Sequence, residues 1–193
     1  MKKAPLTIAA LLTTAASLAS AFSITGQEIG NDVIFNYEGS INTGGLQSFG
    51  GSGLLDTEFE PADNEFSAGG NADLYKFTDL TVTGSMGTGG DVSGVALGDT
   101  IGIFPNFGPG GIEPNIWLPS GYTSGENITG IITFANNTFA AMGITENNTV
   151  TYSWGSGGNA DSITFSTVPE PSSSALWLGL ITVVVSATRR RRS

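Results

Sequence analysis

Paired carboxylates are the remaining route to catalysis in this chain, because it contains no histidine and no cysteine. These absences exclude a cysteine nucleophile, a Ser-His-Asp triad and a histidine-based zinc site. Paired carboxylates can hydrolyse glycosidic bonds, but a dense acidic run is more typical of a solvated loop with weak calcium affinity. Five carboxylates fall within ten residues: Asp56, Glu58, Glu60, Asp63 and Glu65. We therefore expect a protein that is not an enzyme.

The pentapeptide Gly-Gly-Asn-Ala-Asp occurs twice, at residues 69–73 and 157–161. Asp and Asn oxygens beside glycine suit a hard cation, which makes Asp73 and Asp161 weak candidates for calcium ligands. The spacing matches neither an EF-hand loop nor the nonapeptide calcium repeat. A glycine turn with local hydrogen bonds to the backbone is therefore the favoured interpretation. We expect no other metal and no cofactor.

Three aromatic residues could stack against sugar rings: Trp117, Tyr122 and Trp154. Large aromatic residues dominate protein cores, and Trp154 shares a strand-like alternation with Tyr152, so we expect this pair in the core. Trp117 follows a proline-rich loop and is expected to be more exposed. Trp117 and Tyr122 are therefore the candidate glycan-binding residues.

The elements that position these residues are predicted to be strands. Apolar and polar residues alternate at 32–38, 148–154 and 161–166, and period two with β-branched and aromatic residues indicates half-buried strands. Residues 48–70 mix glycine, acids and single aromatics and predict a long irregular loop. Further strands are expected at 74–77, 80–83, 92–97, 128–134 and 138–144. With glycine- and asparagine-rich turns between them, these predict one all-β domain: an antiparallel β-sandwich or jelly-roll-like fold.

The N-terminal end is predicted to be a signal peptide, residues 1–21. Lys2 and Lys3 precede an apolar segment, and Ala19 and Ala21 fit the small-x-small pattern cut by signal peptidase. Between Phe22 and Val168 the chain has one lysine and sixteen acidic residues, a net charge of −15. Such a surface repels nucleic acid.

The C-terminal end combines a rigid motif, an apolar run and a basic cluster. Prolines at 169 and 171 favour an extended segment, such as a protease or transpeptidase can bind. The apolar run at 175–188 is about 21 Å long as a helix, marginal for a hydrocarbon core of about 30 Å. The arginines that follow predict a stop-transfer signal with a cytoplasmic C-terminus. They are Arg189, Arg190, Arg191 and Arg192.

This tail resembles the PEP-CTERM sorting signal of Gram-negative bacteria, which consists of Val-Pro-Glu-Pro, a short transmembrane segment and terminal arginines. The motif residues are Val168, Pro169, Glu170 and Pro171, within a signal spanning 168–193. The resemblance implies processing by an exosortase, transient anchoring in the inner membrane, and export with exopolysaccharide into the envelope or extracellular matrix.

Residues 22–167 are then expected to form the extracellular domain of a non-enzymatic surface or matrix protein. The abundance of Thr, Ser, Asn and Gly, with few long charged side chains, suits a solvated extracellular surface. The alternative is a carbohydrate-binding module of the exopolysaccharide matrix, assisted by calcium.

Overall fold

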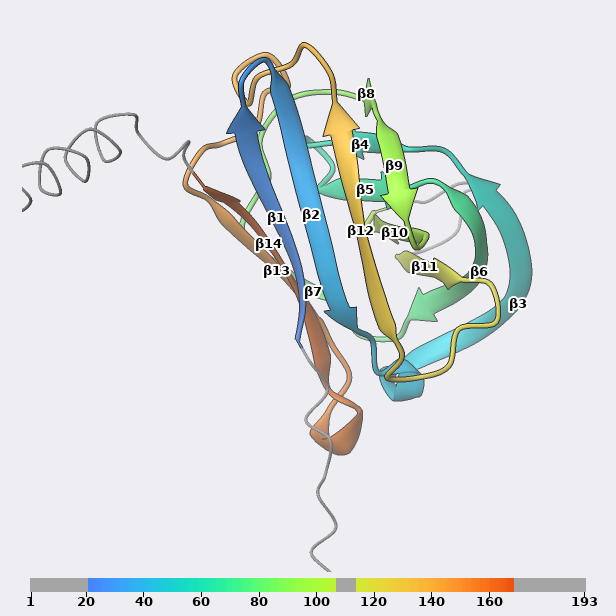
Figure 1. Ribbon diagram of the computed structural model, residues 1–193. Coiled ribbons are helices and arrows are strands. Elements are labelled where there is room, and N and C mark those ends of the chain that lie inside the picture. Colours follow the sequence, from blue (N-terminus) through green and yellow to red (C-terminus); the bar gives the residue numbers. More distant parts are fainter. Residues whose placement is uncertain (1–20, 107–113, 169–193) are drawn as a thin grey trace, which may run out of the picture.

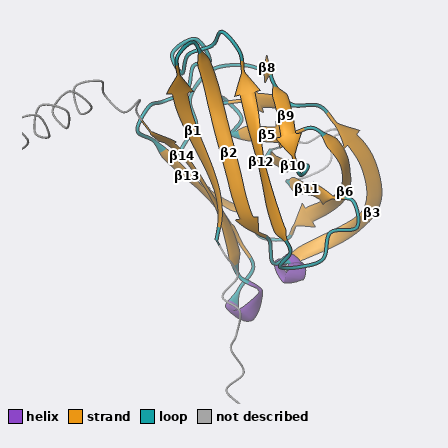
Figure 2. Ribbon diagram, viewed as in Figure 1, coloured by secondary structure: helices purple, strands orange, loops and turns teal. Residues whose placement is uncertain are grey.

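The computed structural model describes residues 21–106 and 114–168, and all but two of the regular elements in this part are strands (Figure 1). The exceptions are single turns of 3-10 helix, η1 (Thr43–Gly45) and η2 (Gly157–Asn159), which lie at the same end of the molecule (Figure 2). Fourteen strands form two seven-stranded sheets. The predicted all-β class is confirmed, and two sheets of mostly antiparallel strands are consistent with a β-sandwich.

The first sheet places the first and last strands of the domain side by side at its centre (Figure 1). β14 (Asp161–Val168) runs parallel to β1 (Phe22–Ile29), with Phe22 opposite Ile163. The other neighbours in this sheet are antiparallel. In spatial order the strands are β7 (Thr81–Thr83), β13 (Thr149–Trp154), β14, β1, β2 (Asp32–Ser40), β12 (Asn127–Phe134) and β9 (Val95–Gly98).

The second sheet is built from antiparallel pairs, and β3 and β8 are its two edges. The register of the β3–β6 pair shifts between Ser48 and Ser52, so β3 carries a bulge. In spatial order the strands are β3 (Leu46–Leu55), β6 (Gly70–Phe77), β11 (Asn115–Pro119), β10 (Ile101–Phe104), β5 (Glu65–Ala68), β4 (Glu58–Glu60) and β8 (Val92–Ser93).

The predicted alternation of strand residues is confirmed where it was clearest. Val33, Phe35 and Tyr37 of β2 are buried, and the residues between them are not. The same pattern holds in β13 and β14, where the inward residues are Val150, Tyr152, Trp154, Ile163 and Phe165. These side chains belong to the main core, which draws on strands of both sheets.

Phe35 lies at the centre of this core. Its ring stacks on Phe59 of the facing sheet at a centroid distance of 5.0 Å, and Phe165 lies 5.4 Å away. Phe134, Phe66 and Phe139 complete the cluster at 5.8, 6.1 and 6.5 Å. Pairs at these separations add about 0.5–1.5 kcal/mol each to the burial of their apolar area.

The outer face of the first sheet is a layer of small polar residues. Two cross-strand ladders cross six strands each, and their only charged residue is Glu38. One ladder is Thr83, Thr151, Thr164, Ser23, Glu38 and Thr129. The other is Thr149, Ser166, Thr25, Asn36, Ile131 and Leu97. None of these residues is fully buried, so water reaches the whole layer.

Two sequence predictions are wrong, and a third, a single strand at 92–97, is only partly right, because Gly94 separates β8 of the second sheet from β9 of the first. Residues 48–70, expected to be irregular, hold most of β3 and all of β4 and β5, because the single aromatics Phe59 and Phe66 are enough to anchor a short hairpin to the core. Residues 138–144, expected to be a strand, form a tight turn in which the Met142 N–H donates to the Thr138 carbonyl oxygen at 3.0 Å.

The packing of Phe35 predicts the effect of one methyl group. A Cβ added to Gly26 of β1 would overlap the Phe35 ring, whereas a Cβ on Gly51, in the bulge of β3, would meet no atom within 4 Å. We expect Gly26→Ala to lower the free energy of unfolding by about 1–3 kcal/mol and Gly51→Ala to change it by less than about 0.5 kcal/mol. Urea denaturation measures both, and equal stabilities of the two variants would contradict this packing.

Candidate functional site

Of the five residues in the acidic run, Glu58, Glu60 and Glu65 lie on strands, whereas Asp56 and Asp63 are exposed in the connections, as predicted for a solvated loop. Phe59 of β4 points into the core, so Glu58 and Glu60 lie on the opposite face of the sheet. Glu65 of β5 stands directly opposite Glu60 in the antiparallel register, and both side chains therefore share that face. β8 pairs with the other side of β4. This brings in Asp91, a carboxylate that sequence spacing did not place in the cluster.

This carboxylate cluster alters its own acid–base chemistry. Burial raises the pKa of Glu65 from 4.5 to about 7, and the carboxylates of Glu60, Asp63, Glu58 and Asp91 add to the rise. Burial also raises the pKa of Glu60, with Asp91 as the next largest cause. Like charges on one face disfavour ionisation, so Glu65 keeps its proton to a higher pH than an isolated carboxyl group does.

The described residues contain no group of three or more His, Cys, Asp or Glu side chains that could hold a metal ion. The two calcium candidates instead bond to the backbone of distant turns. Asp161 Oδ2 accepts from the Asn42 N–H at 2.6 Å, and Asp73 Oδ2 accepts from the Gly121 N–H at 2.8 Å. The favoured interpretation expected local hydrogen bonds, and Asp161 makes one, because its Oδ1 accepts from the Ser162 N–H at 2.8 Å. The other two bonds link segments far apart in the sequence.

The two copies of Gly-Gly-Asn-Ala-Asp also differ in structure. The first enters β6 at Gly70, so its Asn71 and Asp73 are strand residues. The second forms η2 and ends at Asp161, the first residue of β14. Identical residues therefore do not make a structural repeat, and two equivalent calcium loops are not formed.

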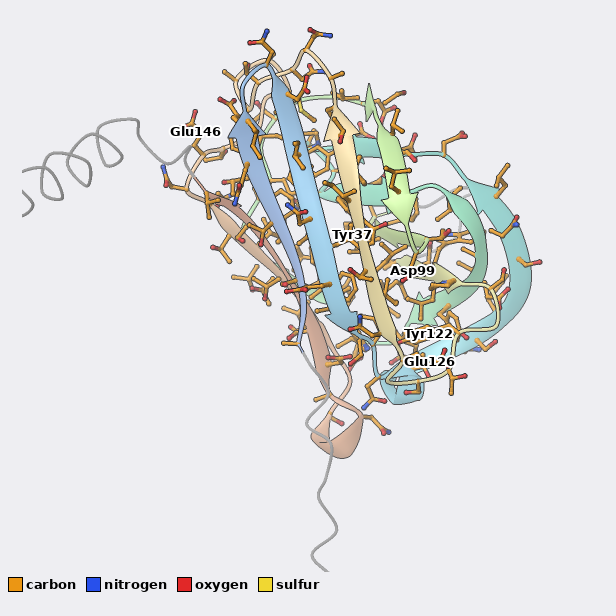
Figure 3. All side chains as sticks on the ribbon, viewed as in Figure 1. Tyr37, Asp99, Tyr122, Glu126 and Glu146 are labelled. Atoms are coloured by element: carbon orange, nitrogen blue, oxygen red, sulfur yellow. The ribbon has the colours of Figure 1, made fainter. Side chains whose placement is uncertain are left out.

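Neither candidate glycan-binding residue offers an open aromatic face. Trp117 is only 8% exposed, so the expectation that it is exposed is wrong. It lies in a small apolar cluster on the outer side of the second sheet, with Leu55, Ala72, Leu74 and Phe104. Tyr122 is partly buried. Its hydroxyl accepts from the Ile41 N–H at 2.8 Å and donates to the Glu126 carbonyl oxygen at 2.8 Å (Figure 3).

The predicted export signals lie mostly outside the described residues. This applies to Ala19, to residues 169–171 of the motif, to the apolar run at 175–188 and to the arginines at 189–192. Ala21 is exposed directly before β1, and Val168 is the last residue of β14. Within 21–106 and 114–168, no helix has the length and hydropathy needed to cross a membrane.

The raised pKa of Glu65 predicts a pH dependence of stability. Between about pH 4.5 and 7 the folded chain keeps the Glu65 proton and the unfolded chain has lost it, so the free energy of unfolding falls as the pH rises. The fall is on the order of 1 kcal/mol, because water screens this partly exposed group. Urea denaturation at a series of pH values measures it.

Replacing Glu65 with Gln is expected to remove most of this fall. Glu146→Gln is the matched control, because Glu146 is exposed in the turn before β13 and is not among the carboxylates that act on Glu65 (Figure 3). A Glu65→Gln variant with the same pH dependence as the parent would show that Glu65 does not hold this proton.

Comparisons with protein-family models, with curated proteins and with solved structures each gave no match.

Proposed function

We propose that this chain is an exported, non-enzymatic surface or matrix protein, sorted and processed by an exosortase through its C-terminal Pro-Glu-Pro signal. The observation that carries the proposal is the position of the first and last strands. β1 begins at Phe22, immediately after the proposed signal peptidase site at Ala21. β14 ends at Val168, the first residue of the motif. All fourteen strands of the described residues therefore lie between Phe22 and Val168.

The position of Val168 also favours access to the motif. Val168 is the last residue of β14 to pair with β1, opposite Gln27. Proline cannot donate to a sheet ladder, so the sequence after Val168 is unsuited to continue the strand, which supports binding of the motif by the sorting enzyme. Because β1 and β14 are parallel, the chain leaves the first sheet at the end opposite to the one where β1 begins. The signal peptidase site and the sorting motif are thus separated by the length of a strand.

The surface supports a place outside the cell. The net charge of −15 between Phe22 and Val168 keeps the body soluble and repels nucleic acid and anionic lipid headgroups. The threonine and serine ladders of the first sheet are hydrated, with Glu38 as their only charged side chain. Exosortase, signal peptidase and the inner membrane are transient partners in this proposal, and exopolysaccharide is the lasting one.

The side chains available support the non-enzymatic part of this proposal. There is no histidine or cysteine nucleophile or base. The strongest acid–base candidate is Glu65, which lies on the outer face of a hairpin at the edge of the second sheet. A general acid also needs a substrate held within hydrogen-bond reach, and the cavities found along β3 and beside η1 and η2 are lined by other residues.

Changing the motif is expected to block processing. In a Gram-negative host with an exosortase, the parent protein should be exported without its arginines, ending near residues 169–172. A variant with Pro169, Glu170 and Pro171 all replaced by Ala should keep its full mass and remain in the inner membrane. Intact-protein mass spectrometry of each fraction decides this. Ser173→Ala is the control and should be processed normally, whereas a parent protein that retains its arginines would overturn the proposal.

A direct assay tests the absence of catalysis. We expect no release of reducing sugar when the exported protein is incubated with neutral and acidic polysaccharides. Turnover that disappears in the Glu65→Gln variant and survives in Glu146→Gln would establish glycoside hydrolysis and refute the non-enzymatic assignment.

A further inference from the structure

The edge strand β9 is the least protected edge of the two described sheets. It is the last strand of the first sheet and pairs only with β12 among the described residues (Figure 1). A sheet edge carries N–H and C=O groups that can pair with another chain, and proteins commonly shield it with a bulge, a very short strand or a lysine. Of the other edges, β3 has a bulge, β8 has two residues and β7 has three. β9 has four residues, no register shift and no lysine.

The register shows which backbone groups of β9 face outward. Asp99, directly after β9, donates its N–H to a carbonyl oxygen of β12 at 2.9 Å. In an antiparallel pair, every second residue bonds to the neighbouring strand. Leu97 and Val95 are therefore the residues of β9 that bond to β12. The N–H and C=O groups of Ala96 and Gly98 point the other way, toward the open edge.

The side chains beside this open edge are apolar and exposed. Val95 and Leu97 are 68% and 69% exposed, and they stand opposite Thr133 and Ile131 on the outer face of the first sheet. A single exposed apolar side chain is normal. Two on one edge strand, next to an open ladder, provide both parts of β-strand addition, in which backbone bonds give affinity and side-chain contacts give specificity.

The charges around β9 are all negative. Only Gly94 separates β9 from β8, and β8 pairs with β4, which carries Glu58 and Glu60. The carboxylate of Asp91, directly before β8, acts on both of these glutamates. The carboxylate cluster therefore lies at the start of β9, and the exposed Asp99 follows its end.

Charge decides which occupant suits this edge. A second copy of the chain would bring another body of net charge −15, and like charges brought together at an interface oppose association. An acidic peptide would be repelled in the same way. A basic peptide carries the complementary charge, which both steers it to the edge and favours the bound state.

We propose that β9 is the docking edge for a basic, extended segment of a partner protein, which adds to the first sheet as a further strand. Its backbone bonds to Ala96 and Gly98, its apolar side chains pack on Val95 and Leu97, and its basic side chains face the carboxylates at either end. A contact with four strand residues is small, in the class below about 1,200 Å² that is typical of transient complexes. This surface is distinct from the sorting signal and does not depend on its processing.

A synthetic peptide in which valine alternates with threonine between terminal lysines is the probe. In the ¹⁵N-labelled exported protein at low ionic strength, it should shift the amide resonances of Ala96 and Gly98 and slow their hydrogen exchange. The amide of Val82, in β7 at the opposite edge of the same sheet, should not respond. Added salt should weaken binding, because it screens the charges. No binding, or equal binding by a peptide with terminal glutamates or with every backbone nitrogen methylated, would overturn the proposal.

Two pairs of variants separate the backbone contribution from the apolar one. Ala96→Pro removes the outward N–H and should weaken binding about tenfold, whereas Ala96→Ser keeps this donor and should bind as the parent does. Leu97→Thr should also weaken binding, whereas Leu54→Thr, at a side chain 76% exposed on β3, should not. Urea denaturation reports on the folding of each variant. Parental affinity in folded Ala96→Pro or Leu97→Thr would refute docking at β9.

A third pair tests the charges. The double variant Glu58→Gln and Glu60→Gln should bind the lysine peptide more weakly and with a smaller salt dependence, whereas Glu146→Gln should change neither. Equal salt dependence in both would contradict the role of the carboxylates.

Sedimentation of the exported protein alone distinguishes the alternative occupant. We expect one monomeric species at every protein concentration. Dimers that form with rising concentration and disappear in Leu97→Thr would show that a second copy covers β9, and would overturn the proposal of a basic partner.

Discussion

The contact of Phe35 with Phe59 is the interaction on which the rest of the structure depends, because it joins the two sheets at their centre. The chain has no cysteine, and the described residues hold no metal cluster, so apolar packing must hold the sandwich together. Every ring in the Phe35 cluster comes from an inward position of its strand or turn. Glycine at position 26 leaves room for the Phe35 ring, and hence a small residue in β1 is as much a part of the core as the aromatics.

Burial of the inward side chains provides most of the stability of the fold. The outward side chains can therefore differ from one part of the surface to another. In the first sheet most outward side chains carry a hydroxyl group, and they interact weakly with one another and strongly with water. In the hairpin of β4 and β5 they are carboxylates that raise one another's pKa.

The sequence predicted the strands whose alternation was unbroken, such as β2, β13 and β14, because burial of every second residue is visible in the chain itself. It failed at residues 48–70, where glycine and acidic residues occupy the outward positions of β3, β4 and β5 and hide the pattern. It also failed for Trp117, since burial on the outer side of a sheet depends on neighbours from other strands. The position of Asp91 beside Glu60 was not predicted for the same reason, because spacing in the sequence does not show which turns lie close together in the fold.

The parallel pairing of β1 with β14 has a consequence for the order of folding. It joins Phe22 to Ile163 across almost the whole domain, and Phe165 of the same last strand completes the aromatic cluster. Contacts of such high sequence separation form slowly, because the chain entropy of closing the loop must be lost before they contribute. The first sheet therefore cannot be completed until the final strand has been synthesised. A nascent chain of this topology stays incompletely packed until its last strand pairs with β1.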